Sequence, residues 1–238
     1  MARLVNFTAG MGLLAVFLTA ACATSAPVDR VEAAENRARL AATSRLPACT
    51  QAETITGGHT AHIPSCRLKA GPSGLNLVVT SDPIEHEMLG PSGFVSISVM
   101  NRQGRLIGEF AEVTHGRYAY PALKDANGDG RQDIIIPRVT SGDATVYSLW
   151  LQQEDGDFAH AGEITGNQIS WSAGGLIAAA RQTGMSDWSV GYFRADAGQL
   201  QEVALVRGEG TKPPRQGGRC EIVRISEGVE PGRFCSAG

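Results

Sequence analysis

KDANGDGRQDIII, residues 124 to 136, joins an oxygen-rich segment directly to three isoleucines. Four of its side chains fall at positions 1, 3, 5 and 9 of a D-x-N-x-D-G-x-x-D pattern: Asp125, Asn127, Asp129 and Asp133. Alternate spacing in a tight loop directs such side chains to one centre, and Gly130 allows the backbone turn that the loop requires. The apolar run that follows, residues 133 to 137, predicts a fully buried strand.

The donor types in this loop point to calcium. Three carboxylates so close together repel one another unless a cation lies between them. Oxygen donors of mixed charge suit Ca²⁺ rather than zinc or copper, and the expected ligands are Asp125, Asn127, Asp129, Asp133 and the carbonyl of Arg131. Ile136 stands where an EF-hand has its bidentate glutamate, which predicts a weak, structural site. The alternative is a series of metal-free Asx turns.

The chain beyond residue 48 has the pattern of an all-β protein. Short runs of branched and aromatic residues alternate with Gly, Pro, Asn or Asp, which is typical of strands and turns. The predicted strands are 75–80, 94–99, 105–110, 133–137, 146–151, 176–180, 188–194, 200–206 and 220–225. Units of about 40 residues recur, which is the length of a propeller blade. We therefore expect a small β-propeller-like domain of antiparallel meanders, with four to five blades, at residues 49–238.

The N-terminus predicts export. Residues 1–21 read as a signal peptide, because Arg3 is followed by an apolar run too short to span a bilayer. Leu18 to Cys22 resembles the lipobox of bacterial lipoproteins, which predicts lipidation of Cys22. Ordinary cleavage after Ala23 is the alternative, and it would leave a soluble periplasmic or secreted protein.

The anchor would be followed by a tether. Residues 22–48 are rich in Ala, Arg and Glu and predict a short exposed helix over 28–46. Ala23 supplies no aspartate retention signal, so we expect the outer membrane, with the domain facing the periplasm. The protein would contact the membrane only through this lipid anchor.

The five cysteines agree with an oxidising compartment. They are Cys22, Cys49, Cys66, Cys220 and Cys235. Lipidation of the first leaves four, for which three pairings exist. Proximity in the sequence favours Cys49 with Cys66 and Cys220 with Cys235, and each loop would stabilise the fold by roughly 3 kcal/mol.

Composition excludes some partners. The 238 residues are 42% hydrophobic and 19% charged, with a formal net charge of -3. This is the composition of an ordinary globular protein. No block of like charge indicates binding to nucleic acid or to an anionic membrane surface.

The acidic stretch and the segments after it resemble a known group of proteins. KDANGDGRQDIII resembles the calcium loop of FG-GAP and VCBS-type propeller repeats. The similarity continues through 146–150, 156–158, 168–171, 184–189, Tyr192 and 198–200. Small bacterial envelope proteins with one such loop share this order over a region like residues 118–206 here. They include lipoprotein immunity proteins against peptidoglycan hydrolases delivered by type IV secretion, and some inhibit lysozyme-like enzymes. The resemblance implies a calcium-bound β-propeller that binds a hydrolase.

No catalytic motif is present. The sequence lacks G-x-S-x-G, H-E-x-x-H and a P-loop, so we expect a protein that is not an enzyme. His59, His62 and Glu53 could hold a metal, although exposed polar side chains are the simpler interpretation. Asp82, Glu85, His86 and Glu87 cluster in a turn, for which a solvated loop is favoured over a pair of catalytic carboxylates.

Two further features could serve binding. Trp171, Trp188 and Tyr192 either form a binding face or, as aromatic residues in propellers more often do, pack in the core. The acidic segment Glu154 to Asp157 could meet a basic hydrolase.

These features together predict a non-enzymatic, calcium-binding envelope lipoprotein that binds a protein partner. The sharper expectation is an immunity protein or inhibitor of a lysozyme-like peptidoglycan hydrolase. The alternatives are a structural or adhesion-like module that binds glycan or a surface protein, and a hydrolase whose site the sequence does not reveal.

Overall fold

The computed structural model describes residues 27–49, 64–71, 73–84, 92–115, 120–141, 144–172, 175–210 and 219–235. The elements in these ranges are α1 (Pro27–Ser44), β1 (Cys66–Ala70), β2 (Leu75–Ile84), β3 (Ser92–Met100), β4 (Leu106–His115), β5 (Ala122–Lys124), β6 (Asp133–Ser141), β7 (Ala144–Gln152), β8 (Phe158–Gly166), β9 (Gln168–Ser172), β10 (Leu176–Gln182), β11 (Asp187–Asp196), β12 (Gln199–Glu209), β13 (Cys220–Ile225) and the short 3-10 helix η1 (Pro231–Arg233).

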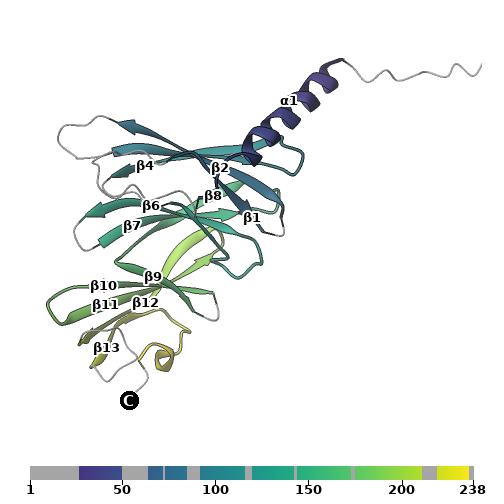
Figure 1. Cartoon of the computed structure of the whole chain (residues 1–238). Coiled ribbons are helices and arrows are strands. Elements are labelled where there is room, and N and C mark those ends of the chain that lie inside the picture. Colours follow the sequence, from purple (N-terminus) through teal and green to yellow (C-terminus); the bar gives the residue numbers. More distant parts are fainter. Residues whose placement is uncertain are drawn as a thin grey trace, which may run out of the picture.

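The strands form three antiparallel meanders that lie one below another (Figure 1). The first meander is β1–β4, the second β5–β8 and the third β9–β13. A single parallel bridge between His115 and Val139 joins the first two meanders into one eight-stranded sheet. The third meander is a separate five-stranded sheet in the order β13-β12-β11-β10-β9.

The three isoleucines of the opening stretch explain how the layers are held together. They lie on β6, in the middle layer, and all three are buried. Ile134 and Ile136 point into a core shared with the first meander, whereas Ile135 belongs to a core shared with the third. A strand that is covered on both faces needs a continuous apolar run rather than an alternating one. The predicted buried strand is therefore confirmed.

Pro137 marks a change of neighbour along β6. Before it, β6 pairs with β5; after it, Val139 meets His115 of β4. Proline has no N–H to donate, so it is tolerated where one edge of a strand lacks a partner. The register with β7 also shifts between Pro137 and Val139.

Each end of the domain is closed by a disulfide. Cys49 is joined to Cys66, with 4.8 Å between the Cα atoms, and Cys220 to Cys235, with 5.7 Å. This is the pairing that proximity in the sequence predicts. The second bridge brings η1 and the buried Phe234 against the outer face of the third meander.

The predicted helix is present, but it is more than an exposed tether. Thr43 is buried; its hydroxyl donates to the carbonyl of Arg39 at 2.9 Å, and its Oγ1 lies 3.8 Å from the sulfur of Met100. Arg39 donates to the carbonyl of Gly104, in the β3–β4 turn, at 3.2 Å. The C-terminal half of α1 is therefore packed on the first meander, while its N-terminal half projects away (Figure 1).

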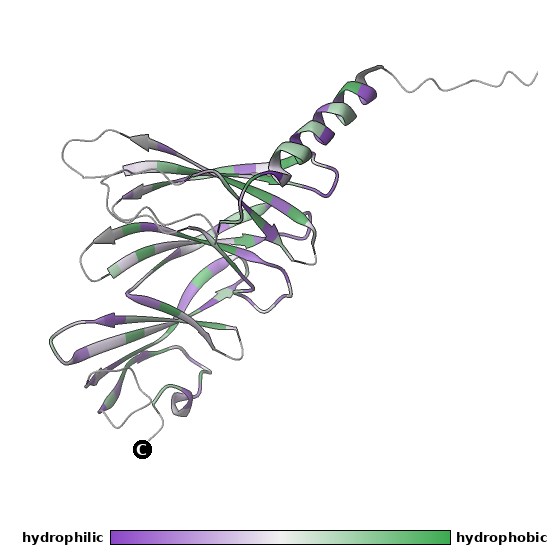
Figure 2. Ribbon diagram, viewed as in Figure 1, coloured by the Kyte–Doolittle hydropathy of each residue, from purple (hydrophilic) through white to green (hydrophobic). Residues whose placement is uncertain are grey.

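Hydrophobic residues concentrate in the strands, and α1 carries polar and apolar residues intermixed (Figure 2). None of the helical segments that the structure describes combines the length and the hydrophobicity needed to cross a bilayer.

The all-β prediction is confirmed, whereas the propeller with four to five blades is not. In the part of the chain that the structure describes, the strands make three meanders in two open sheets. Central strands of nine to ten residues, such as β2, β3 and β4, make each meander longer than the expected unit.

Candidate functional site

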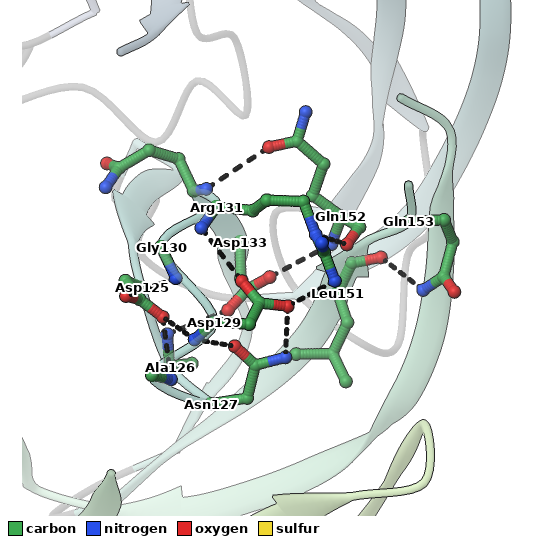
Figure 3. A network of polar contacts seen from close by, with 12 residues as sticks. Asp125, Ala126, Asn127, Asp129, Gly130, Arg131, Asp133, Leu151, Gln152 and Gln153 are labelled. Carbon is green, nitrogen blue, oxygen red and sulfur yellow. Dashed lines mark hydrogen bonds and ion pairs between the residues drawn. The ribbon is translucent and has the colours of Figure 1, made fainter. Parts of the chain in front are cut away.

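The acidic loop, residues 125–133, connects β5 to β6 and is ordered by its own hydrogen bonds (Figure 3). The carboxylate of Asp125 accepts the N–H groups of Gly128 at 2.7 Å, Asp129 at 3.1 Å and Gly130 at 3.0 Å. Gly128 and Gly130 have φ values of 79° and 84°, a region that favours glycine. The two glycines of the motif are therefore required by the backbone.

Arg131 neutralises the centre of the loop. Its guanidinium forms an ion pair with Asp129 at 2.6 Å, and its Nε donates to the carbonyl of Gln152 at 3.0 Å. The side-chain amide of Asn127 also donates to Asp129, at 2.8 Å. These contacts tie the loop to the end of β7.

Asp133 is the most deeply buried carboxylate of the loop, with no exposed surface. It accepts the N–H of Ala126 at 2.7 Å and the N–H of Gln152 at 2.9 Å. Burial raises the pKa of Asp133 to about 6; its two backbone hydrogen bonds lower it, and the charges of Asp129 and Asp125 raise it further. Asp133 thus links the loop, the start of β6 and the end of β7.

The donor set fits a hard cation in its chemistry, because carboxylate and amide oxygens are ligands that Ca²⁺ prefers. Asp125 Oδ2, Asn127 Oδ1 and Asp129 Oδ1 each accept one hydrogen bond, and such an oxygen has a second lone pair. However, no three Asp, Glu, His or Cys side chains among the described residues are grouped so that they could hold a metal. The metal-free alternative, a series of Asx turns, accounts for the observed contacts, and calcium stays a prediction.

Most of the remaining predicted site residues lie outside the part of the chain that the structure describes. Cys22 lies outside the described residues, as do Glu53, His59, His62, Glu85, His86 and Glu87. Asp82 is an exposed residue on β2.

The three aromatic residues pack in the core rather than on a binding face. Trp188 is 4% exposed, and the ring of Tyr192 lies 4.6 Å from that of Phe234. Trp171 is partly buried against the core between the second and third meanders, with Lys124 Nζ 5.3 Å from its ring centroid.

Glu112 of β4 joins the first two meanders through its side chain. The sequence did not single out this residue. It accepts hydrogen bonds from Ser148 at 2.6 Å and from the indole of Trp150 at 2.8 Å. Arg138 lies 3.1 Å from its second oxygen and also pairs with Glu163. Alternation along β4 places Glu112 on the same face as Phe110, which stacks on Trp150. That alternation was the available signal for its burial.

A serine–histidine pair raises the question of catalysis. Ser92 Oγ and His115 Nδ1 are 2.7 Å apart, across the β3–β4 ladder. Ser92 is only 1% exposed, and a nucleophile must reach its substrate. The contact is consistent with a structural cross-strand pair.

Comparison with known proteins gives distant similarities. No family model and no curated protein matches the chain. A Xanthomonas type IV secretion system related protein is 14% identical, with a TM-score of 0.44, over 70% of this chain and 97% of that one. PliI-Ah, a periplasmic lysozyme inhibitor of I-type lysozyme from Aeromonas hydrophyla, is 16% identical, with a TM-score of 0.36, over 43% of this chain and 87% of that one. At these scores neither structure establishes a shared fold.

Proposed function

We propose that this protein is a non-enzymatic envelope lipoprotein that binds a protein partner, and that the partner is a lysozyme-like peptidoglycan hydrolase. Cys22 would carry the lipid, and the domain would face the periplasm. The proposal rests on negative charge at one edge of the second meander. Two neighbouring connections carry this charge, the acidic loop between β5 and β6 and the turn between β7 and β8.

The β7–β8 turn is the observation that carries this proposal. Its three acidic residues, Glu154, Asp155 and Asp157, are all exposed. The turn is fixed by three hydrogen bonds. The N–H of Gln153 donates to the carbonyl of Asp157 at 2.8 Å, and the N–H of Gly156 donates to the carbonyl of Gln153 at 3.1 Å. Asp155 accepts the N–H of Asp157 at 3.1 Å. A rigid turn loses little conformational entropy when a partner binds.

The acidic loop lies beside this turn. Gln152, directly before the turn, accepts Arg131 Nε and donates its N–H to Asp133. The charge of Asp129 is offset by Arg131, whereas Glu154, Asp155 and Asp157 form no ion pair within the described part of the chain. Such a patch speeds association with a basic partner and favours it over an acidic one.

Calcium is a further part of the proposal. The side chains of Asp125, Asn127, Asp129 and Asp133, with the carbonyl of Arg131, would hold the ion. Bound Ca²⁺ would supply positive charge to a site that now depends on Arg131, and its role would be structural. We also propose that the three meanders correspond to propeller-type blades, because each presents an apolar face to the next.

Inhibition of a hydrolase is the direct test. The whole chain would be added to a basic lysozyme, and release of labelled peptidoglycan fragments would be followed with calcium and with a chelator. We expect dose-dependent inhibition and no release by the protein alone. Release without lysozyme would contradict the non-enzymatic proposal, and unchanged lysozyme activity would contradict inhibition of that enzyme class.

Charge-neutral variants locate the surface. Glu154→Gln combined with Asp155→Asn removes two charges and keeps the oxygen that accepts the N–H of Asp157. Glu227→Gln combined with Glu230→Gln removes two exposed charges on the third meander and serves as the matched control. We expect the first pair to weaken inhibition roughly tenfold and to reduce its salt dependence. Equal inhibition by both pairs would exclude the acidic turn as the binding surface.

Recovery from the cell envelope tests the partner and the anchor. A peptidoglycan hydrolase recovered with the tagged chain supports the proposal, whereas recovery of porins or glycan favours a structural envelope module. Cys22→Ser should release the protein from the membrane fraction, and unaltered fractionation would argue against lipidation.

A further inference from the structure

The two disulfides of the domain differ in how well they are covered. Cys49 and Cys66 are both fully buried in the core of the first meander. Cys220 and Cys235 are only partly buried, on the outer side of the third meander. Thiol–disulfide exchange requires a thiolate to reach one of the two sulfur atoms, so its rate depends on access. A reductant should therefore meet the second bridge far more readily than the first.

The accessible bridge fastens a short C-terminal segment. Residues 227–235, which we call the C-terminal cap, follow β13 and include η1 (Figure 1). The backbone N–H groups of Val229, Arg233 and Phe234 donate to carbonyls three residues earlier in the chain, at 3.1–3.3 Å. In the part of the chain that the structure describes, no backbone hydrogen bond and no ion pair joins the cap to a strand.

Apolar contacts hold the C-terminal cap on the sheet. Phe234 is 3% exposed, and its ring lies 4.6 Å from that of Tyr192 on β11. Phe234 belongs to a core cluster with Val190 and Val206, and Val229 packs against the same cluster. A segment held by so few buried side chains opens at a low free energy compared with the central strands.

The bridge keeps this weakly bonded segment in place. Cys220 is the first residue of β13, which is paired with β12, so Cys235 is tied to a fixed strand. A short covalent loop holds Phe234 close to its place in the core, which raises its effective concentration there. Once the bridge is broken, the cap is joined only through the end of β13, and its open state becomes more populated.

We propose that the Cys220–Cys235 bridge is a redox clasp, which a dithiol reductant opens to release the C-terminal cap from the third meander. The reductant would belong to the class of exported thiol–disulfide oxidoreductases. One of its thiolates attacks a sulfur of the bridge, which breaks the S–S bond and forms a mixed disulfide, and its second thiolate then displaces the protein's cysteine. The bridge gains two electrons and two protons as two thiols, and the reductant becomes a disulfide.

Release of the cap would uncover the apolar face around Tyr192 and Val206. The buried Cys49–Cys66 bridge would leave the first meander intact. The redox clasp lies on a different meander from the acidic turn proposed to meet a hydrolase, and it does not depend on that partner.

Alkylation of the native protein tests the access to the two bridges. The whole chain is treated with dithiothreitol without denaturant, and the thiols are trapped with iodoacetamide at intervals and located by mass spectrometry. We expect Cys220 and Cys235 to be modified about tenfold faster than Cys49 and Cys66, or more. Equal rates for the two bridges, or faster modification of the buried one, would overturn the proposal.

Hydrogen exchange tests whether reduction releases the cap. After selective reduction, the amides of residues 227–235 should exchange about tenfold faster, an apolar dye should bind, and β1 should be unchanged. Reoxidation should restore the slow exchange. A reduced protein whose cap keeps its protection would show that the bridge is not a clasp.

A variant without the bridge separates release of the cap from other effects of the reductant. Cys220→Ser combined with Cys235→Ser should exchange at the cap as fast as the reduced protein, and dithiothreitol should cause no further change. Glu230→Gln, an exposed change on the cap that keeps the bridge, is the control and should respond to the reductant like the unchanged protein. A double variant whose cap is as protected as in the oxidised protein would also overturn the proposal.

Discussion

The acidic loop and the end of the β11–β12 ladder, where Asp187 faces Glu209, differ in how their negative charges are met. In the acidic loop Asp125, Asp129 and Asp133 each accept backbone N–H groups, and Asp129 also meets Arg131. At the end of the β11–β12 ladder Asp187 and Glu209 stand opposite each other, and neither forms an ion pair within the described part of the chain. A conspicuous motif can therefore be satisfied by its own backbone, while an inconspicuous pair of like charges across a sheet is left to repel.

The largest effect should come from removing the most deeply connected carboxylate. Asp133→Ala leaves the N–H groups of Ala126 and Gln152 without their acceptor in a buried place. We expect a loss of roughly 4 kcal/mol in the free energy of unfolding. The melting temperature should fall by about 8–16 °C. Asp196→Ala, an exposed residue on β11, is the control and should change little. Equal melting temperatures for both variants would mean that Asp133 does not hold the loop to β7.

The pH dependence of stability gives the next largest effect. The pKa of Asp133 is raised from 3.8 to about 6 in the folded protein, so the folded state holds its proton more tightly than the unfolded state. The favourable contribution is complete below pH 3.8 and is lost as pH rises through about 6. The total change is about 3 kcal/mol.

The measurement compares the unchanged protein with Asp133→Asn in chelator between about pH 4 and pH 8, the range over which the carboxyl titrates. The difference in unfolding free energy should turn against the unchanged protein as pH rises, because only this protein acquires the buried charge. A difference that stays constant across this range would show that the carboxyl has an ordinary pKa.

Calcium should have a smaller effect, because the loop is already ordered by hydrogen bonds. At a concentration tenfold above the dissociation constant, the ion should add about 1.4 kcal/mol. The melting temperature should rise by roughly 3–6 °C. Asp129→Ala should lower the melting temperature and remove its dependence on calcium. If chelator and calcium give the same melt for the unchanged protein, the calcium proposal fails while the hydrogen-bonded loop stands.

Much of the fold could be predicted, because the residue pattern of some strands indicates which of their faces are buried. The isoleucines of β6 indicate burial on both faces, and cysteine proximity gave both disulfides. Strands β1, β5, β8 and β9 were missed. They are short or rich in polar and small residues, and such segments become strands only through packing against their neighbours. Gly162 lies against Leu200, and Gly166 against the backbone of Ala180. Such distant contacts leave no local pattern.

The sites were less predictable, because they depend on register. The acidic loop is local and was found, but the partners that meet its charges were not. In the β11–β12 hairpin, Asp196 pairs with Gln199, and an unbroken ladder would place Asp187 opposite Gly208. A bulge between Tyr192 and Phe193 shifts the pairing by one residue and brings Glu209 opposite Asp187. Residue counting from the turn does not reveal that bulge.

The smallest effect should come from relieving the repulsion between Asp187 and Glu209. Whether the free energy of unfolding rises or falls is the informative result. Asp187→Asn removes one of two facing charges and should raise the free energy of unfolding by about 0.5 kcal/mol, a gain of roughly 1–2 °C in melting temperature. Asp196→Asn, at the other end of β11, faces the uncharged Gln199 and should give no gain. High salt should reduce the gain, because it screens exposed charges. A loss of stability in Asp187→Asn would mean that the carboxylate already has a favourable contact.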